Sequence, residues 1–233
     1  MVYSASLPYG ARVKLPLVAK VNSPIKEEGK YYPGFKKVIG FFSQYMELAT
    51  LYKAKAVIAV SKFSHDVLLS EYNADSTVVP DGVDSSFFSP DKDEGKPVVA
   101  FPRRRDPRKN LEAIEATELY LAGRVEYCHE PQRADIFFAP SFSEGFDISL
   151  LEAMSSGCAC LASDIPAHRE LIREGVDGWL FTDKEDMKEK LDMLVEEPRL
   201  RKMFGKFARE KALGYSWETC AEKTEKVFVG ALA

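Results

Sequence analysis

Residues 134–157 read ADIFFAPSFSEGFDISLLEAMSSG, and this stretch decides the fold class. An apolar run is followed by a polar loop that contains glycine, and then by a segment whose apolar residues recur at helical spacing. Gly157 comes at the end of that segment, where a left-handed residue often terminates a helix. The stretch therefore predicts a strand–loop–helix unit, which is the building block of parallel α/β sheets.

The loop and the start of this predicted helix form a candidate ligand site. The first N–H groups of a helix have no partner within it, and the helix dipole favours a phosphate at that end. Glu144 and Glu152 flank this point, and carboxylates accept hydrogen bonds from sugar or ribose hydroxyls. The alternative is that both are solvated surface glutamates.

A second candidate segment is FPRRRDPRKN, residues 101–110. It holds five cations within the seven residues from Arg103 to Lys109, and it directly follows the predicted strand 98–101. Arginine binds phosphate as a bidentate fork and lysine binds it as a point charge, so the loop could grip a diphosphate. The alternative is a solvated basic turn.

The rest of the chain continues the alternation of strands and helices. Strands are expected at 13–21, 56–60, 77–80, 98–101, 125–128, 135–139, 158–162 and 178–181. Helices are expected at 34–52, 61–72, 110–121, 148–156, 166–174, 184–197, 200–213 and 217–232. This order predicts parallel α/β layers, with ligands bound beyond the carboxyl ends of the strands. The polar segment 91–96 divides them into two Rossmann-type lobes, which we place at 1–94 and 95–233.

Composition narrows the class of partner. The 233 residues carry a formal net charge of −4 at a pI of about 5.6, whereas a nucleic-acid binder usually has a basic face. We therefore expect no nucleic-acid partner. No apolar run approaches the ~20 residues of a membrane span, and the start lacks the order of a signal peptide. Together with the few cysteines, this predicts a cytoplasmic protein.

Cysteine and histidine do not indicate a metal site. Cys158 and Cys160 share one face of a predicted strand, but no second pair and no histidine lies near them in the sequence. Buried thiols are the preferred interpretation, and we expect neither a metal nor a cofactor. His65, His129 and His168 are scattered and are interpreted as ordinary surface or helix residues.

Taken together, the motifs resemble family-four retaining glycosyltransferases of the two-lobed GT-B type. The arrangement from Glu144 to Gly157 looks like the E-x7-E signature of that family. VVPDGVDSSFFSP, residues 78–90, is similar to the family's connection between lobes, and Arg104 and Lys109 are spaced like the pair in its G-R-x-x-x-x-K loop. SWETCAEKTEKVF, residues 216–228, resembles the final helix that crosses back to the N-terminal lobe.

The resemblance implies an activity and a role for each matched position. It implies transfer of a sugar from a nucleoside diphosphate sugar to a sugar, lipid or glycan acceptor, with retention of configuration and without a metal. Glu144 would bind the donor sugar, and Arg104 and Lys109 would neutralise the leaving diphosphate. Glu152 would bind the ribose. The other implied donor-side positions are Arg103, Gly145, Phe146, Ser149 and Leu150, the last two through their backbone N–H groups.

The chain also departs from the family pattern. The N-terminal lobe is expected to be incomplete, because it lacks the family's Gly-rich loop. Asn22, on the acceptor side, replaces a histidine that lies near the transferred sugar, and it cannot titrate. Arg103 replaces a glycine, and the segment between Leu121 and Ala134 is shorter than in the family. These departures leave open a non-catalytic or partner-dependent sugar-nucleotide binder and, at lower weight, an epimerase of the same architecture.

Two surface features bear on partners. Residues 34–45, GFKKVIGFFSQY, mix lysine with aromatic residues. Packing within the lobe is the simpler interpretation, and peripheral contact with a lipid surface is the alternative. An incomplete lobe would expose apolar surface, which favours a homo-oligomer or a partner chain.

Overall fold

The computed structural model describes residues 2–4, 16–24, 27, 30–31, 35–85, 95–102 and 106–232. Internal contacts divide the chain into two compact units, Met1–Asp81 with Trp217–Ala233, and Gly82–Ser216. The division predicted between residues 94 and 95 lies next to the stretch 86–94, which is outside the described residues. Each unit contains a parallel sheet, so the predicted α/β class with two Rossmann-type parallel sheets is confirmed.

The first unit is built on four described strands in the order β1-β2-β3-β4, all parallel. They are β1 (Val2–Ser4), β2 (Leu17–Val21), β3 (Ala56–Ala59) and β4 (Thr77–Val78). Every residue of β2 is buried, as expected for a parallel strand covered on both faces. Its one charged residue, Lys20, is paired with the buried carboxylate of Asp81.

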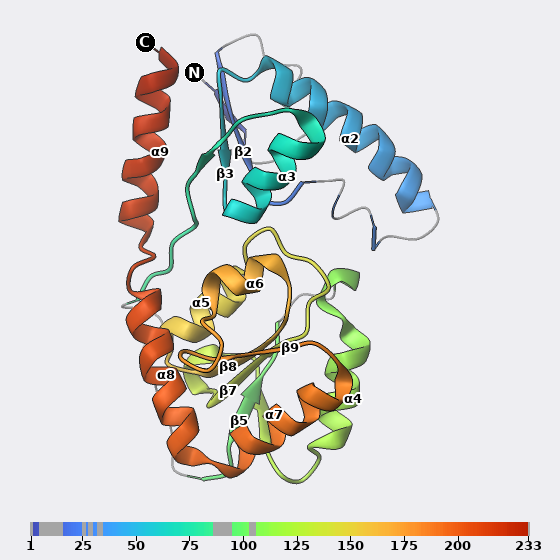
Figure 1. Cartoon of the computed structure of the whole chain (residues 1–233), viewed down its shortest axis with the longest axis vertical. Coiled ribbons are helices and arrows are strands. Elements are labelled where there is room, and N and C mark those ends of the chain that lie inside the picture. The colour runs from blue at the N-terminus through green and yellow to red at the C-terminus, as the bar shows by residue number, and fades with distance from the viewer. Residues whose placement is uncertain are drawn as a thin grey trace. The chain divides into compact units, whose positions relative to one another are not determined.

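Three described helices accompany this sheet: α2 (Phe35–Lys53), α3 (Lys62–Tyr72) and α9 (Trp217–Leu232). Helix α3 begins where predicted, because the Ser61 side chain caps it by accepting from the Ser64 N–H. It ends at Asn73 in the left-handed conformation. Helix α9 buries Cys220 against Val18 and Ile58 of the first sheet, although it follows the second unit in the chain (Figure 1).

The second unit has five described strands in the order β6-β5-β7-β8-β9, again all parallel. They are β5 (Val98–Ala100), β6 (Glu126–Cys128), β7 (Ile136–Ala139), β8 (Ala159–Ser163) and β9 (Trp179–Phe181). The chain leaves β5 toward β6 on one side and then returns to β7 on the other. Strand order therefore reverses between β5 and β7, and such a switch point is where open α/β sheets bind ligands.

The helices of the second unit are close to their predicted positions. They are α4 (Leu111–Tyr120), α5 (Ile148–Ser155), α6 (Pro166–Leu171), α7 (Lys184–Glu196) and α8 (Pro198–Ala212), with single turns η2 (Pro107–Lys109) and η3 (Pro131–Arg133). Pro198 occupies the first turn of α8, where its missing N–H costs nothing. Helix α6 stops earlier than predicted, because Asp177 accepts from both the N–H and the side chain of Arg173 and builds a turn there.

Aromatic side chains fill the core of this unit. Phe138 of β7 lies edge-on to Phe101 and stacked on Phe181, with ring centroids 6.1 and 5.6 Å apart. Trp179 meets Phe204 of α8 edge-on at 5.0 Å. Because both faces of β7 and β8 are covered, the loops that leave their carboxyl ends start from fixed positions.

Helix α8 passes very close to the end of α5. Gly157 has a positive φ of 73°, which confirms it as the glycine that ends α5. A Cβ built on Gly205 would lie 2.0 Å from the Gly157 carbonyl oxygen, and that neighbour is backbone that cannot rotate away. The two glycines therefore allow two backbones to touch.

We predict that Gly205→Ala destabilises the second unit. A methyl group forced into a packed contact typically costs ~1–3 kcal/mol or more, because backbone must shift. Gly230→Ala is the matched control, since that helical glycine in α9 has no atom within 4 Å of a built Cβ. The control is expected to be neutral or stabilising by up to ~1 kcal/mol. Urea unfolding of both variants measures the difference, and equal stabilities would contradict the close contact.

Candidate functional site

The loops that follow β5 and β7 lie together at the point where strand order reverses. The N–H of Phe142, in the loop after β7, donates to the carbonyl oxygen of Arg108, in the loop after β5, at 2.7 Å. This bond fixes one predicted ligand loop against the other. The structure thus brings together the two segments that the sequence selected separately.

The turn η2 aims Lys109 into this region. Asp106 caps the turn by accepting from the Arg108 N–H at 2.9 Å, and its carboxylate also pairs with the Arg108 guanidinium at 2.8 Å. Asn110 follows in the left-handed conformation and caps α4 through its side-chain oxygen. Arg108 is therefore engaged within the turn, whereas Lys109 extends toward the loop after β7. Arg103, Arg104 and Arg105 lie outside the described residues.

Lys109 is the centre of a buried ionic cluster. Its ammonium nitrogen lies 2.7 Å from Glu144 Oε1 and 3.3 Å from each carboxylate oxygen of Asp147. The side chains of Lys109, Glu144 and Asp147 are 9%, 10% and 1% exposed. Glu144 and Lys109 are therefore not the solvated surface residues of the alternative interpretations.

His168 completes the cluster, and the sequence analysis missed it. The residue lies on a helix, α6, as the interpretation allowed, but it is fully buried, so a surface position is excluded. Its Nε2 lies 3.3 Å from Asp147 Oδ2, and its Nδ1 lies 2.9 Å from the carbonyl oxygen of Ser163. The neighbouring parallel strands β7 and β8 bring residues 147 and 168 together, although 21 positions separate them.

Burial and charge shift three pKa values in the cluster. Burial alone would raise the pKa of Asp147, but the ammonium of Lys109 and the contacts with His168 and the Leu150 N–H hold it well below its ordinary value. Burial opposes the charge of Lys109, yet the two carboxylates outweigh it and raise the Lys109 pKa. Burial and the nearby Asp147 charge raise the pKa of Glu144. These shifts favour the charged forms of Lys109 and Asp147 and the protonated form of Glu144.

The start of α5 is arranged differently from the expectation. Asp147 is the N-cap, and its Oδ1 accepts from the Leu150 N–H at 3.2 Å. That N–H, predicted to hold a phosphate together with the N–H of Ser149, already has a partner within the protein. Phe146 is buried and packs on Tyr215, with ring centroids 6.0 Å apart.

The remaining predicted residues are placed as follows. Gly145 is buried in the loop beside Glu144, and Glu152 is partly buried on α5. Asn22 is exposed directly after β2. Asn22 belongs to the first unit, whereas the ionic cluster belongs to the second.

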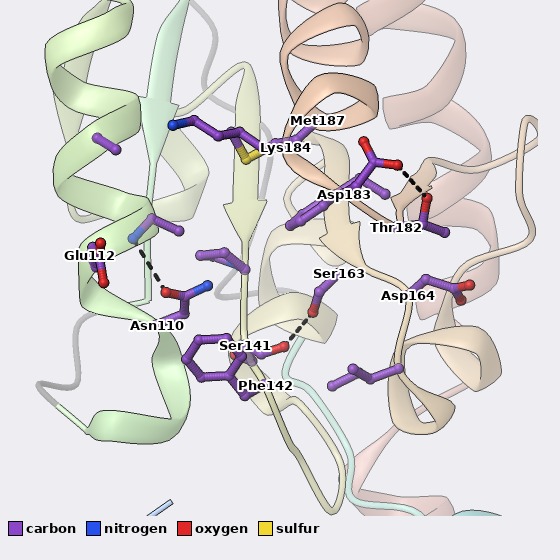
Figure 2. A pocket seen from close by; sticks show the side chains of 15 residues that line it. Asn110, Glu112, Ser141, Phe142, Ser163, Asp164, Thr182, Asp183, Lys184 and Met187 are labelled. Carbon is purple, nitrogen blue, oxygen red and sulfur yellow. Dashed lines mark hydrogen bonds between the residues drawn. The ribbon is translucent and has the colours of Figure 1, made fainter.

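A cavity of about 500 Å³ adjoins the same two loops (Figure 2). Figure 2 shows Asn110 and Phe142 on one side of it and Asp183 and Lys184, at the start of α7, on another. Its apolar lining includes Phe142, Ile165, Phe181 and Met187. The hydrogen bond from Ser163 Oγ to the Ser141 carbonyl oxygen belongs to its wall, and the Ser163 carbonyl also contacts His168.

The described part of the chain was also compared with the features of metal sites and membrane spans. Among the described residues, no three histidine, cysteine, aspartate or glutamate side chains cluster as metal ligands would. Cys158 and Cys160 are fully buried thiols, as predicted, and the Cys158 thiol donates to the carbonyl oxygens of Pro131 and Ala134. No described helix combines the length and the apolar character that a membrane span requires.

Comparison with known proteins shows a family similarity over part of the chain. The family model for "Glycosyl transferases group 1" matches residues 120–211. The N,N'-diacetylbacillosaminyl-diphospho-undecaprenol alpha-1,3-N-acetylgalactosaminyltransferase of Campylobacter jejuni is 33% identical over 141 residues, which are 59% of this chain and 38% of that protein. Across three curated relatives the chain spans 38%, 56% and 21% of their lengths.

Solved structures show the same fold at low identity. Sucrose-phosphate synthase from Thermosynechococcus elongatus superposes with a TM-score of 0.80 at 17% identity, over 95% of this chain and 69% of that one. Anabaena HepE, solved in complex with UDP-glucose, superposes with a TM-score of 0.70 at 16% identity, over 92% and 72%. The GT-B-like fold expected from the sequence is confirmed.

Proposed function

We propose that the chain takes part in sugar transfer from a nucleoside diphosphate sugar to an acceptor, with retention of configuration. The match of residues 120–211 to the glycosyl transferases group 1 model and the GT-B-like fold support this proposal. One observation carries the proposal. A lysine held charged lies with a carboxylate of raised pKa at the switch point of the second sheet. Such an edge is where α/β proteins bind nucleotides.

Each residue of the cluster has a part in the proposed reaction. The bond that breaks joins the sugar to the diphosphate, so negative charge grows on the leaving phosphate. Lys109 is a preorganised cation for that charge, and it would favour the transition state over the bound donor. Glu144 would accept hydrogen bonds from the sugar hydroxyls, and Glu152 from the ribose. Arg103 and Arg104 are proposed to add positive charge to the same loop.

The acceptor is proposed to be lipid-linked. The Campylobacter relative acts, by its name, on an undecaprenol diphosphate carrier. In this chain Phe42, Tyr45 and Tyr52 of α2 are 62%, 64% and 79% exposed. Their spacing of three and seven residues places them on one helix face, and amphipathic aromatic side chains suit the interface between lipid and water. This also supports peripheral contact with a membrane.

The test is a ligand-stability screen of the whole chain with UDP, GDP and ADP and their sugars. A ligand that binds only the folded protein raises the melting temperature by mass action. We expect one nucleotide to raise it, by ~2–4 °C or more at saturating concentration. The shift should disappear in Lys109→Ala and Glu152→Ala, each compared with its own ligand-free baseline. Added EDTA should leave it unchanged, since we propose no metal requirement.

The outcomes separate the proposal from its rival. A shift followed by release of nucleoside diphosphate in the presence of a lipid-linked sugar acceptor would support transfer. A shift without turnover under any acceptor would favour the alternative, a nucleotide-sugar-binding protein that needs a partner chain. No shift with any nucleotide would contradict the proposed donor site.

A further inference from the structure

The environment of His168 defines which of its ring nitrogens carry hydrogen. Nε2 faces Asp147 Oδ2 at 3.3 Å, and Nδ1 faces the Ser163 carbonyl oxygen at 2.9 Å and Ser163 Oγ at 3.3 Å. A carboxylate and a carbonyl oxygen can only accept. Ser163 Oγ donates its own hydrogen to the Ser141 carbonyl, so toward the ring it is an acceptor as well.

Acceptors therefore face both ring nitrogens. A neutral imidazole has one N–H and one bare nitrogen, so it would leave one contact as two lone pairs facing each other. The ring is fully buried, so water cannot relieve that contact. Only the doubly protonated ring satisfies both contacts at once.

The charges nearby agree with a cationic ring. Asp147 is its direct carboxylate partner, and the remaining charges of the cluster are Lys109 and Glu144. The other acidic residue that acts on it, Asp164, is itself paired with Arg169 at the surface. With Glu144 ionised and His168 charged, the four buried groups carry two positive and two negative charges. With a neutral ring the same burial would enclose a net negative charge, at a point where an anion has to bind.

We propose that His168 is a buried imidazolium and that it acts as a positioning residue: through Asp147, it keeps Lys109 in place and available to a diphosphate. Asp147 lies between Lys109 and the His168 ring. Because its negative charge interacts with both cations, it neutralises Lys109 less completely. The imidazolium also fixes the Asp147 carboxylate by a second contact, which limits its rotation away from Lys109. The positioning role rests on the proposed function, whereas the charge of the ring does not.

The first measurement concerns the ligand-free whole chain. Nitrogen-15 NMR distinguishes the two states of the ring, because two protonated nitrogens resonate close together and a bare nitrogen resonates far from a protonated one. At about pH 7 we expect the His168 signals, assigned by their loss in His168→Gln, to be those of an imidazolium. Asp147→Asn should convert them to a neutral pattern, whereas the control Asp164→Asn should leave them unchanged. A neutral His168 in the wild type would overturn the proposal.

The second measurement uses inorganic pyrophosphate as a probe of the phosphate site, titrated into folded wild type and His168→Gln. Glutamine keeps a hydrogen-bond donor but carries no charge, so the loss of charge is tested with little loss of bonding. We expect pyrophosphate to bind about tenfold more weakly to His168→Gln and equally well to the control His65→Gln.

The two readouts separate this inference from the proposed function. An imidazolium signal with unchanged pyrophosphate affinity in His168→Gln would overturn the positioning role. An imidazolium signal in a wild type that binds neither pyrophosphate nor any nucleotide would support the charge assignment and contradict the proposed function instead.

Discussion

Replacing Lys109 by methionine is expected to lower the rate of sugar transfer by at least about a hundredfold. Removing one preorganised group that stabilises developing charge in a buried site typically costs 10²–10³-fold in turnover. Lys109 is such a group under the proposed function, because burial protects its charge from water and two carboxylates hold its ammonium in place. Methionine is close in length and apolar, so it removes the charge with little change in volume.

The kinetic pattern identifies the reason for the loss. If Lys109 acts mainly on the leaving diphosphate, kcat should fall more than donor affinity, because the charge it meets is larger in the transition state. The matched control is Lys202→Met, which removes an exposed lysine of α8 in the same unit. Assays at low temperature, with a melting curve for each variant, exclude unfolding as the cause. A Lys109→Met protein with wild-type kcat would contradict the assigned role.

The β7–loop–α5 unit could be predicted because its signals are local. An apolar run of residues 136–139 reads as a buried parallel strand, and Gly157 marks the end of the following helix. Both signals depend on a few neighbouring residues, so no tertiary information was needed. The loop segments were found in the same way, from their charge and from their position directly after strands.

The interior of the cluster could not be predicted, because it depends on tertiary pairing. Asp147 reads in the sequence as one more polar loop residue, yet it is the helix cap and the bridge between Lys109 and His168. No periodicity connects positions 109, 147 and 168. They meet because the sheet aligns the carboxyl ends of β5, β7 and β8. The Leu150 N–H donates to Asp147 in the same arrangement. The sequence shows only that the first N–H groups of a helix lack partners within the helix, so this bond could not be predicted from it.

The run of cations shows a related difference between composition and geometry. Five positive residues between positions 103 and 109 suggest one basic patch. In the structure Arg108 is paired with Asp106 within its own turn, whereas Lys109 is buried against two carboxylates from another loop. Arg108 and Lys109 are neighbours in the sequence, but their side chains point to different partners. Only the structure shows this difference.

The largest expected effect on stability is that of Asp147→Ala, which should lower the free energy of unfolding by about 3–5 kcal/mol. Removing one member of a buried charge network leaves its partners uncompensated, and that is the usual cost. Here Lys109 and the His168 ring both lose a carboxylate, and α5 loses its cap. Asp183→Ala is a matched control, because Asp183 also caps a helix, α7, but is exposed. The control should cost only ~1 kcal/mol.

The loss of stability in Asp147→Ala should depend on pH if it has an electrostatic origin. The pKa of Asp147 is lower in the folded protein than its ordinary value, so the unfolded chain binds the proton more readily. Its contribution to stability is therefore fully present above the unfolded value of ~3.9 and is lost as the pH falls below it. Glu144 has a raised pKa and acts in the opposite sense, and because the Asp147 charge is one cause of that shift, Asp147→Ala also reduces this opposing contribution. In urea unfolding, the gap between wild type and Asp147→Ala should narrow as the pH falls from about 5 to below about 4. A gap that is independent of pH would mean that lost packing, rather than lost charge, destabilises the variant.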